Sequence, residues 1–128
     1  MKKVGIMGGT FNPIHFGHLF LAESAYEQLE LDKVIFIPSK NPPHKVVAGN
    51  ITQEQRVRMI SLSIRDNPHF ELSLMELERD GVTYTADTLA ILTEANPDTE
   101  YFFLVGADSL MQLHTWKNPE KICALCRL

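Results

Sequence analysis

Glycines and histidines near the start of the chain have the types and spacing of a phosphate-binding loop. Residues 8–18 read Gly-Gly-Thr-Phe-Asn-Pro-Ile-His-Phe-Gly-His, directly after an apolar run at Val4–Met7. Glycines let backbone N–H groups approach a phosphate, and imidazoles at a helix N-terminus add directed donors for the same anion. The spacing differs from Gly-x-Gly-x-x-Gly and from the Walker A loop, which needs Gly-Lys-Ser/Thr. The loop therefore predicts a phosphate site in which His15 and His18 share one helix face.

The elements that must position this loop can be read from four apolar runs that alternate with helix-like stretches. The runs are Val4–Met7, Val34–Ile37, Phe70–Met75 and Tyr101–Val105. Alternating strands and helices predict a parallel sheet with right-handed crossovers, in which ligands bind at the carboxyl ends of the strands. We therefore expect an α/β, Rossmann-like parallel sheet with helices on both faces, forming one domain over residues 1–128.

Local signals mark where the helices begin. Between the first two runs, apolar residues recur at helical spacing: Leu19, Ala22, Tyr26 and Leu29. Thr52 and Gln55 predict a capping box, and Thr85 or Asp87 is expected to cap a helix that carries Leu89 and Leu92. Asn118-Pro119 predicts an N-cap followed by proline at the first position of a last helix.

Composition and charge exclude several classes of protein. Of 128 residues, 45% are hydrophobic and 22% are charged, which is typical of a globular protein that can bury a core. The net charge of −4 argues against binding to polymeric nucleic acid, which needs a basic surface. No apolar run approaches the roughly 20 residues that span a bilayer, and polar residues interrupt the stretch that a signal peptide needs. We therefore expect a cytoplasmic protein that binds no membrane.

The two cysteines, Cys123 and Cys126, have Cys-x-x-Cys spacing. No second Cys or His pair lies nearby to complete a zinc site, and a redox pair normally opens a helix just after a strand. The pattern favours two small hydrophobic residues on one helix face, with a redox or metal pair as the alternative.

The loop at residues 8–18 resembles a known group of enzymes. His-Phe-Gly-His resembles the His-x-Gly-His signature of the nucleotidylyltransferase superfamily, and the whole string is similar to the opening of bacterial nicotinate mononucleotide adenylyltransferases. The resemblance implies transfer of AMP from ATP to nicotinate mononucleotide, which gives nicotinate adenine dinucleotide and pyrophosphate in NAD biosynthesis. The alternatives are another adenylyltransferase of the superfamily, for phosphopantetheine or nicotinamide mononucleotide, and an inactive nucleotide-binding fragment.

The resemblance also implies which residues bind ATP. His15 and His18 would be catalytic, with His18 donating to the α-phosphate and His15 holding the β/γ side. The expected ATP-binding residues are Gly8, Gly9, Thr10, Phe11, Gly106 and Asp108. Asp108 can equally cap the next helix, and the residues alone do not rank the two roles. Mg²⁺ is expected to arrive with ATP rather than in a protein cage.

Three later motifs resemble the mononucleotide side of the same family. The loop Pro42-Pro43-His44-Lys45 would lie beside the mononucleotide phosphate, although a solvated proline turn is the alternative. A backbone N–H near Thr85, in Tyr-Thr-Ala-Asp-Thr, would hold the pyridine carboxylate, with Asp87 in the same segment. Trp116, the only tryptophan, would stack on the pyridine ring, with a core position as the alternative.

The mechanism that the resemblance implies is direct, in-line attack by the mononucleotide phosphate on the α-phosphorus of ATP. No Ser, Cys or Lys nucleophile is placed for a covalent intermediate, so the loop would supply positioning and charge stabilisation. The sequence leaves open whether the protein forms a homo-oligomer.

The chain departs from the family at its end. The family's later Ser-Ser/Thr-Thr-x-Ile-Arg signature does not occur in its expected place. Ser61–Arg65 looks similar, but it lies inside the helix expected before the third strand. We therefore expect the C-terminal part of the fold to be missing, with weak ATP affinity and poor turnover for these 128 residues.

Overall fold

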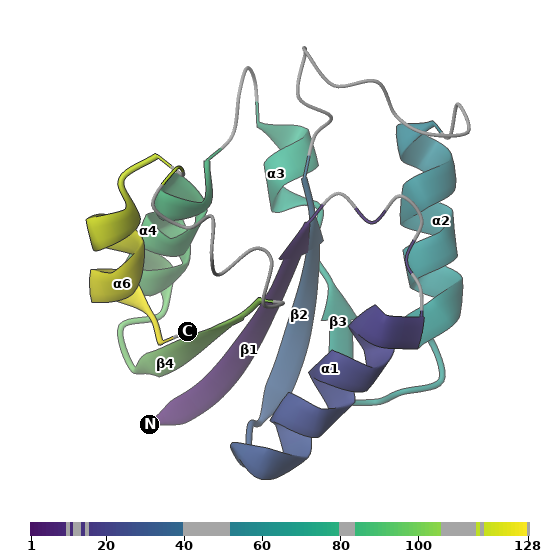
Figure 1. Ribbon diagram of the computed structural model, residues 1–128, viewed down its shortest axis with the longest axis horizontal. Coiled ribbons are helices and arrows are strands. Elements are labelled where there is room, and N and C mark those ends of the chain that lie inside the picture. The colour runs from purple at the N-terminus through teal and green to yellow at the C-terminus, as the bar shows by residue number, and fades with distance from the viewer. Residues whose placement is uncertain are drawn as a thin grey trace.

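The computed structural model describes residues 1–9, 11, 14, 16–39, 52–79, 84–105, 115 and 117–127. In chain order the elements are β1 (Lys2–Gly9), α1 (Phe16–Gln28), β2 (Lys33–Pro38), α2 (Gln53–Ile64), β3 (Phe70–Leu72), α3 (Met75–Glu78), α4 (Thr85–Ala95), β4 (Thr99–Leu104) and α6 (Pro119–Leu125). The strands form one sheet in the order β3-β2-β1-β4, and every pair in it is parallel. Figure 1 shows α1 and α2 on one face of the sheet and α4 and α6 on the other. The predicted fold class is confirmed.

Two hydrophobic clusters hold these layers together, one on each face of the sheet. Successive strand residues alternate between them: Val34 and Phe36 pack with α1 and α2, whereas Ile35 and Ile37 pack with α4 and α6. Because both faces are covered, the strands read as continuous apolar runs rather than as alternating ones. This is why the sequence located the central strands so readily.

The strand order reverses between β1 and β4. The chain runs from β1 to β2 and β3 on one side, and then crosses to place β4 on the other side of β1. Met7 pairs with Leu104 in this register, so both strands end near the same point. An open parallel sheet binds ligands in the crevice at such a reversal.

Two strand boundaries differ from the sequence prediction. Gly8 and Gly9 do not follow the first strand but end it, because parallel pairing continues to Gly8 opposite Ile37 and Gly9 opposite Pro38. The third strand, expected over Phe70–Met75, stops at Leu72, and Met75 begins the short helix α3. This edge strand pairs with β2 alone, so little holds it extended beyond three residues.

The helix termini agree with the sequence in part. The capping box is confirmed, since Gln55 N donates to Thr52 Oγ1 at 3.1 Å and Thr52 N donates to Gln55 Oε1 at 2.9 Å. Neither Thr85 nor Asp87 caps α4: the N-cap is Tyr84, which has no side-chain acceptor bond there. Asn118 does precede α6, but in a left-handed conformation without a side-chain bond.

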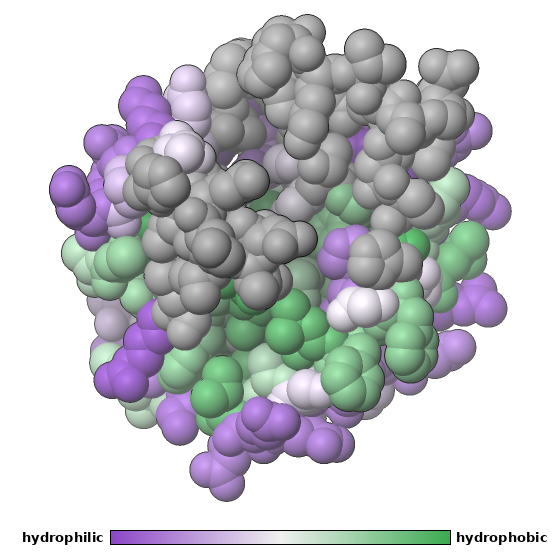
Figure 2. Space-filling model, viewed as in Figure 1, coloured by the Kyte–Doolittle hydropathy of each residue, from purple (hydrophilic) through white to green (hydrophobic). Residues whose placement is uncertain are grey.

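Helix α1 carries apolar side chains on both its buried and its solvent faces. Ala22 is fully buried, but Leu29, predicted on the same face, lies beyond the helix end and is 39% exposed. Phe16 and Phe20 are exposed, and their rings stack with centroids 6.3 Å apart. Figure 2 shows hydrophobic residues gathered over α1 on this face.

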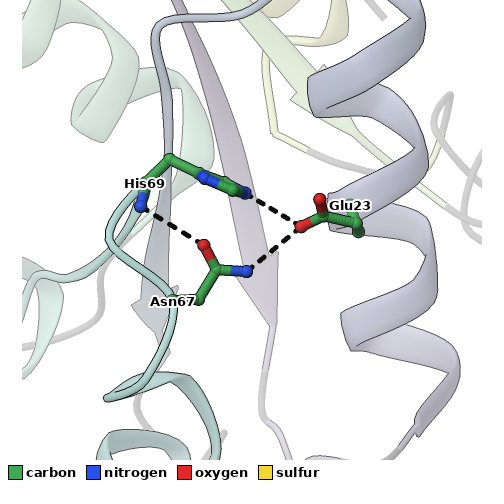
Figure 3. Close-up of polar contacts among 3 residues, drawn as sticks. All are labelled: Glu23, Asn67 and His69. Carbon is green, nitrogen blue, oxygen red and sulfur yellow. Dashed lines mark hydrogen bonds and ion pairs between the residues drawn. The ribbon is translucent and has the colours of Figure 1, made fainter.

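A polar cluster joins the middle of α1 to the segment that enters β3. Glu23 Oε2 accepts from His69 Nε2 at 2.9 Å and from Asn67 Nδ2 at 3.1 Å, as Figure 3 shows. The His69 ring stacks on Tyr26 with centroids 3.6 Å apart. Since His69 precedes β3, this cluster lies at the amino ends of the strands, away from the reversal, and we assign it to structure.

The C-terminal helix does not place the two cysteines on one face. Cys123 is exposed on α6, whereas Cys126 follows the helix, is half-buried and packs against the cluster beneath α4. Arg127 then bridges the outer edge of β4 in parallel, with Phe103 N donating to Arg127 O at 2.6 Å. Ser61–Ile64 lie in α2, as expected, so their likeness to the family's later signature is superficial. In the described part of the chain, no helix combines the length and the apolar character needed to cross a membrane.

Candidate functional site

The start of α1 holds His18 against the end of β1. His18 is half-buried in the first turn, and its ring meets the Phe11 ring edge-on, with centroids 4.9 Å apart. Phe11 is only 3% exposed and also packs near Phe36 of β2. The Phe11 side chain is therefore a support for the imidazole, and any contact of Phe11 with a nucleotide must come from its backbone.

The backbone at this turn is unusual in two places. Phe11 has φ 52°, a left-handed conformation that costs a non-glycine residue about 1–3 kcal/mol. Gly9 has φ 154°, and a Cβ atom added there would meet nothing within 4 Å. Gly8 has no such conformation, and a Cβ there would lie 3.5 Å from the Phe103 ring. Only Gly9, at the open side of the strand end, needs glycine for its backbone.

A buried arginine ties the ends of β1 and β2 to α2, and sequence reasoning did not predict it. Arg56 is fully buried, and its Nη1 donates to Ser39 O at 3.1 Å. Ser39 N in turn donates to Gly9 O at 2.8 Å. Burial lowers the pKa of the Arg56 guanidinium from its ordinary value, although arginine stays charged in proteins. Ser39, the first residue after β2, is thus bonded both to Gly9 at the end of β1 and to Arg56 of α2.

The N-terminus of α4 lies at the same end of the sheet as the turn after β1 (Figure 1). Thr85 is its first residue and half-buried, while Asp87 is exposed in the first turn. Because no side chain in the described part of the chain caps this helix, its first N–H groups and its dipole favour an anion there. Lys117, next to Trp116 in the chain, places its Nζ 4.3 Å from the centre of the Tyr84 ring. Lys117 and the α4 N-terminus are therefore neighbours.

Three polar residues that were not predicted join α3 to α4. Glu76 is 8% exposed and Thr88 is 3% exposed, and Thr88 Oγ1 donates to Glu76 Oε2 at 2.9 Å. Arg79 Nη2 donates to Thr88 Oγ1 at 3.1 Å. Only Thr88 carried a signal, since it belongs to the Tyr-Thr-Ala-Asp-Thr motif. Nothing local in the sequence marks Glu76 or Arg79 as its partners.

Several predicted site residues lie outside the described residues. They are Thr10, His15, His44, Lys45, Gly106, Asp108 and Trp116. The described members form two groups: Gly8, Gly9, Phe11 and His18 run from the end of β1 to the first turn of α1, and Thr85 and Asp87 lie in the first turn of α4. Within the described ranges, no three His, Cys, Asp or Glu side chains gather as a metal site.

The parallel sheet, its reversal beside β1 and the position of Gly9 and His18 on either side of the β1–α1 connection define a Rossmann-like α/β protein. Comparison with family models places it more closely: the chain belongs to the cytidylyltransferase-like family, whose model matches residues 6–128. The resemblance in its opening loop is thereby confirmed at the level of the family.

Curated relatives narrow the comparison. A probable nicotinate-nucleotide adenylyltransferase of Lachnoclostridium phytofermentans is 59% identical over 120 residues, covering 94% of this chain and 60% of the relative. One of Lactococcus lactis subsp. lactis, with the same name, is 45% identical over 124 residues, covering 97% of this chain and 64% of the relative. The chain therefore spans less than two thirds of the length of these relatives.

Solved structures support the fold independently. A structure from Vibrio parahaemolyticus aligns with TM-score 0.81 at 23% identity, covering 99% of this chain and 71% of that one. The nicotinic acid mononucleotide adenylyltransferase of Plasmodium falciparum, solved with NaAD, aligns with TM-score 0.79 at 21% identity, covering 95% and 60%. At these identities the likeness concerns the fold.

Proposed function

We propose that this protein is a nicotinate-nucleotide adenylyltransferase, which transfers AMP from ATP to nicotinate mononucleotide and releases pyrophosphate. The observation that carries the proposal is that Gly9 ends β1 and His18 lies in the first turn of the helix that follows, beside the reversal of strand order. Backbone N–H groups and an imidazole at a helix N-terminus are suited to a phosphate chain. The names of the curated relatives support the choice of substrate.

The chemistry that this site supports is direct phosphoryl transfer. The mononucleotide phosphate attacks the α-phosphorus in line, and pyrophosphate leaves from the opposite side. His18, held edge-on by Phe11, donates to the α-phosphate as negative charge develops. Thr10 and His15 hold the β- and γ-phosphates in this proposal, and Gly106 and Asp108 serve the ATP side. Mg²⁺ bound to the ATP phosphates would offset their negative charge.

The mononucleotide docks with its pyridine end at α4. A backbone N–H near Thr85 donates to the carboxylate at the N-terminus of α4, with Asp87 in the same turn. Trp116 stacks on the ring, and the cation–π contact between Lys117 and Tyr84 supports this placement because it joins the two segments. His44 and Lys45 take the mononucleotide phosphate.

A substrate panel under single-turnover conditions tests the proposal. The chain, in excess over labelled ATP and with Mg²⁺ present, is mixed with nicotinate mononucleotide, nicotinamide mononucleotide, phosphopantetheine or phosphocholine. Single turnover detects even a slow transfer, because product accumulates to the amount of ATP supplied. We expect nicotinate adenine dinucleotide to form faster than any other adenylylated product. Preference for another acceptor would assign another transferase, and ATP binding without transfer to any acceptor would assign a nucleotide-binding module.

A further inference from the structure

The bonds among Glu76, Thr88 and Arg79 form a buried cross-link between α3 and the first turn of α4. The Thr88 hydroxyl donates to a carboxylate oxygen at 2.9 Å and accepts from a guanidinium at 3.1 Å. Buried polar groups are stabilising only when they are hydrogen-bonded, and breaking such a set is costly. Thr88 is almost fully buried, so water does not replace either partner easily.

This cross-link fixes the rotation of α4 about its own axis. Ala86 and Leu89 hold one side of the helix in the cluster against the sheet, where they are 1% and 0% exposed. Thr88 holds another side against α3. Thr88 lies one turn after Thr85, so a helix fixed at Thr88 also has a fixed direction for its first N–H groups. Tyr84 supplies no side-chain cap that could take over this task.

We propose that Thr88, held by Glu76 and Arg79, is a positioning residue that sets the preference for an acid over an amide at the pyridine-binding end of the site. This inference rests on the proposed function. A charge-assisted hydrogen bond from a backbone N–H to a carboxylate is stronger than a bond to a neutral amide and depends steeply on its angle. Misalignment of α4 therefore weakens binding of the acid more than binding of the amide.

Equilibrium binding of the two mononucleotides to the 128-residue chain tests the proposal without need for turnover. Titration calorimetry gives the dissociation constants of nicotinate and nicotinamide mononucleotide for wild type and for Thr88→Val, which keeps the shape and removes the hydroxyl. We expect the acid to bind about tenfold more weakly to Thr88→Val, the loss of about one well-aligned charge-assisted bond. The dissociation constant of the amide should change less than about threefold. The ratio of the amide constant to the acid constant, which measures the preference for the acid, should therefore fall.

Three further variants separate positioning from plain stability. Thr93→Val removes a hydroxyl that bonds within α4 itself, to Leu89 O at 2.7 Å, and should leave the ratio at its wild-type value. Thr88→Ser keeps the hydroxyl and should restore the ratio. Glu76→Gln keeps one acceptor oxygen but not the charge, and should lower the ratio by a smaller factor. If Thr88→Val does not fold, Glu76→Gln carries the test.

The outcomes are distinguishable. A folded Thr88→Val that loses thermal stability but keeps the wild-type ratio would overturn the positioning role and leave the proposed function standing. An equal fall of the ratio in Thr93→Val would also overturn the positioning role, because the Thr93 hydroxyl bonds within α4 and not to α3. Wild-type protein without any preference for the acid would refute the proposed substrate itself, whatever the variants do.

Discussion

Gly8 and Gly9, which end β1, should lose different amounts of folding stability when each is replaced with Ala. Replacing Gly9 with Ala puts a Cβ atom into open space, but on a backbone with φ 154° that L residues rarely adopt. The cost is conformational and should be about 1–3 kcal/mol. Replacing Gly8 with Ala puts a Cβ at ordinary contact distance, 3.5 Å, from the Phe103 ring. This second change should alter stability by less than about 1 kcal/mol.

Urea unfolding followed by circular dichroism measures both variants against wild type. For a chain of this length, each kcal/mol should lower the melting temperature by roughly 3–6 °C, so Gly9→Ala is also visible in a thermal scan. The Ser39 N–H bonds to the Gly9 carbonyl, so a relaxed Gly9→Ala backbone would disturb the exit of β2 as well. Equal costs for the two variants, or a larger cost at Gly8, would refute the assignment of the turn to Gly9.

Three other predictions concern the packing, the pH dependence and the thiols. Leu89→Ala, at a fully buried position of α4, should cost about 2–5 kcal/mol in unfolding free energy, whereas Ile91→Ala, at a position 45% exposed, should cost less than about 1 kcal/mol. The hydrogen bond from His69 lowers the pKa of the Glu23 carboxyl below its ordinary value of 4.5, so its stabilisation is present above that pH and is lost as the pH falls through the lowered pKa. Acid titration of stability should therefore be shallower in Glu23→Gln than in wild type, and an equally steep loss of stability would contradict this. Burial raises the pKa of the Cys126 thiol to about 11, so a thiol reagent at pH 8 should modify the exposed Cys123 first, and equal rates would contradict this.

The sequence predicted the parts of the fold whose cause is local. Three of the four strands could be predicted from continuous apolar runs, because both faces of the sheet are covered. The Thr52–Gln55 capping box could be predicted because it depends on residues only three apart. The strand ends were less predictable. Gly8 and Gly9 extend β1 because β2 lies beside them to pair with, a fact that no property of glycine reveals.

The parts of the site that the sequence did not predict depend on contacts between distant segments. Arg56 occurs in a helix pattern where a charged residue predicts exposure, yet it is fully buried because Ser39, seventeen residues away in sequence, accepts its hydrogen bond. Glu76 and Thr88 meet only because α3 and α4 pack together. Phe11 likewise has a left-handed backbone and a buried ring in contact with His18, and the sequence marks neither. Tertiary contacts of this kind leave no periodic signal in a single sequence.

The proposed role of His18 is tested most directly by single-turnover AMP transfer and ATP binding in His18→Ala, with a thermal scan to show that the variant is folded. If His18 donates to the α-phosphate in the transition state, transfer to nicotinate mononucleotide should slow by about 10²–10³-fold. The dissociation constant of ATP should meanwhile change by less than about threefold, since the lost interaction belongs to the transition state. Unchanged transfer, or a loss that arises wholly from weaker ATP binding, would contradict the account.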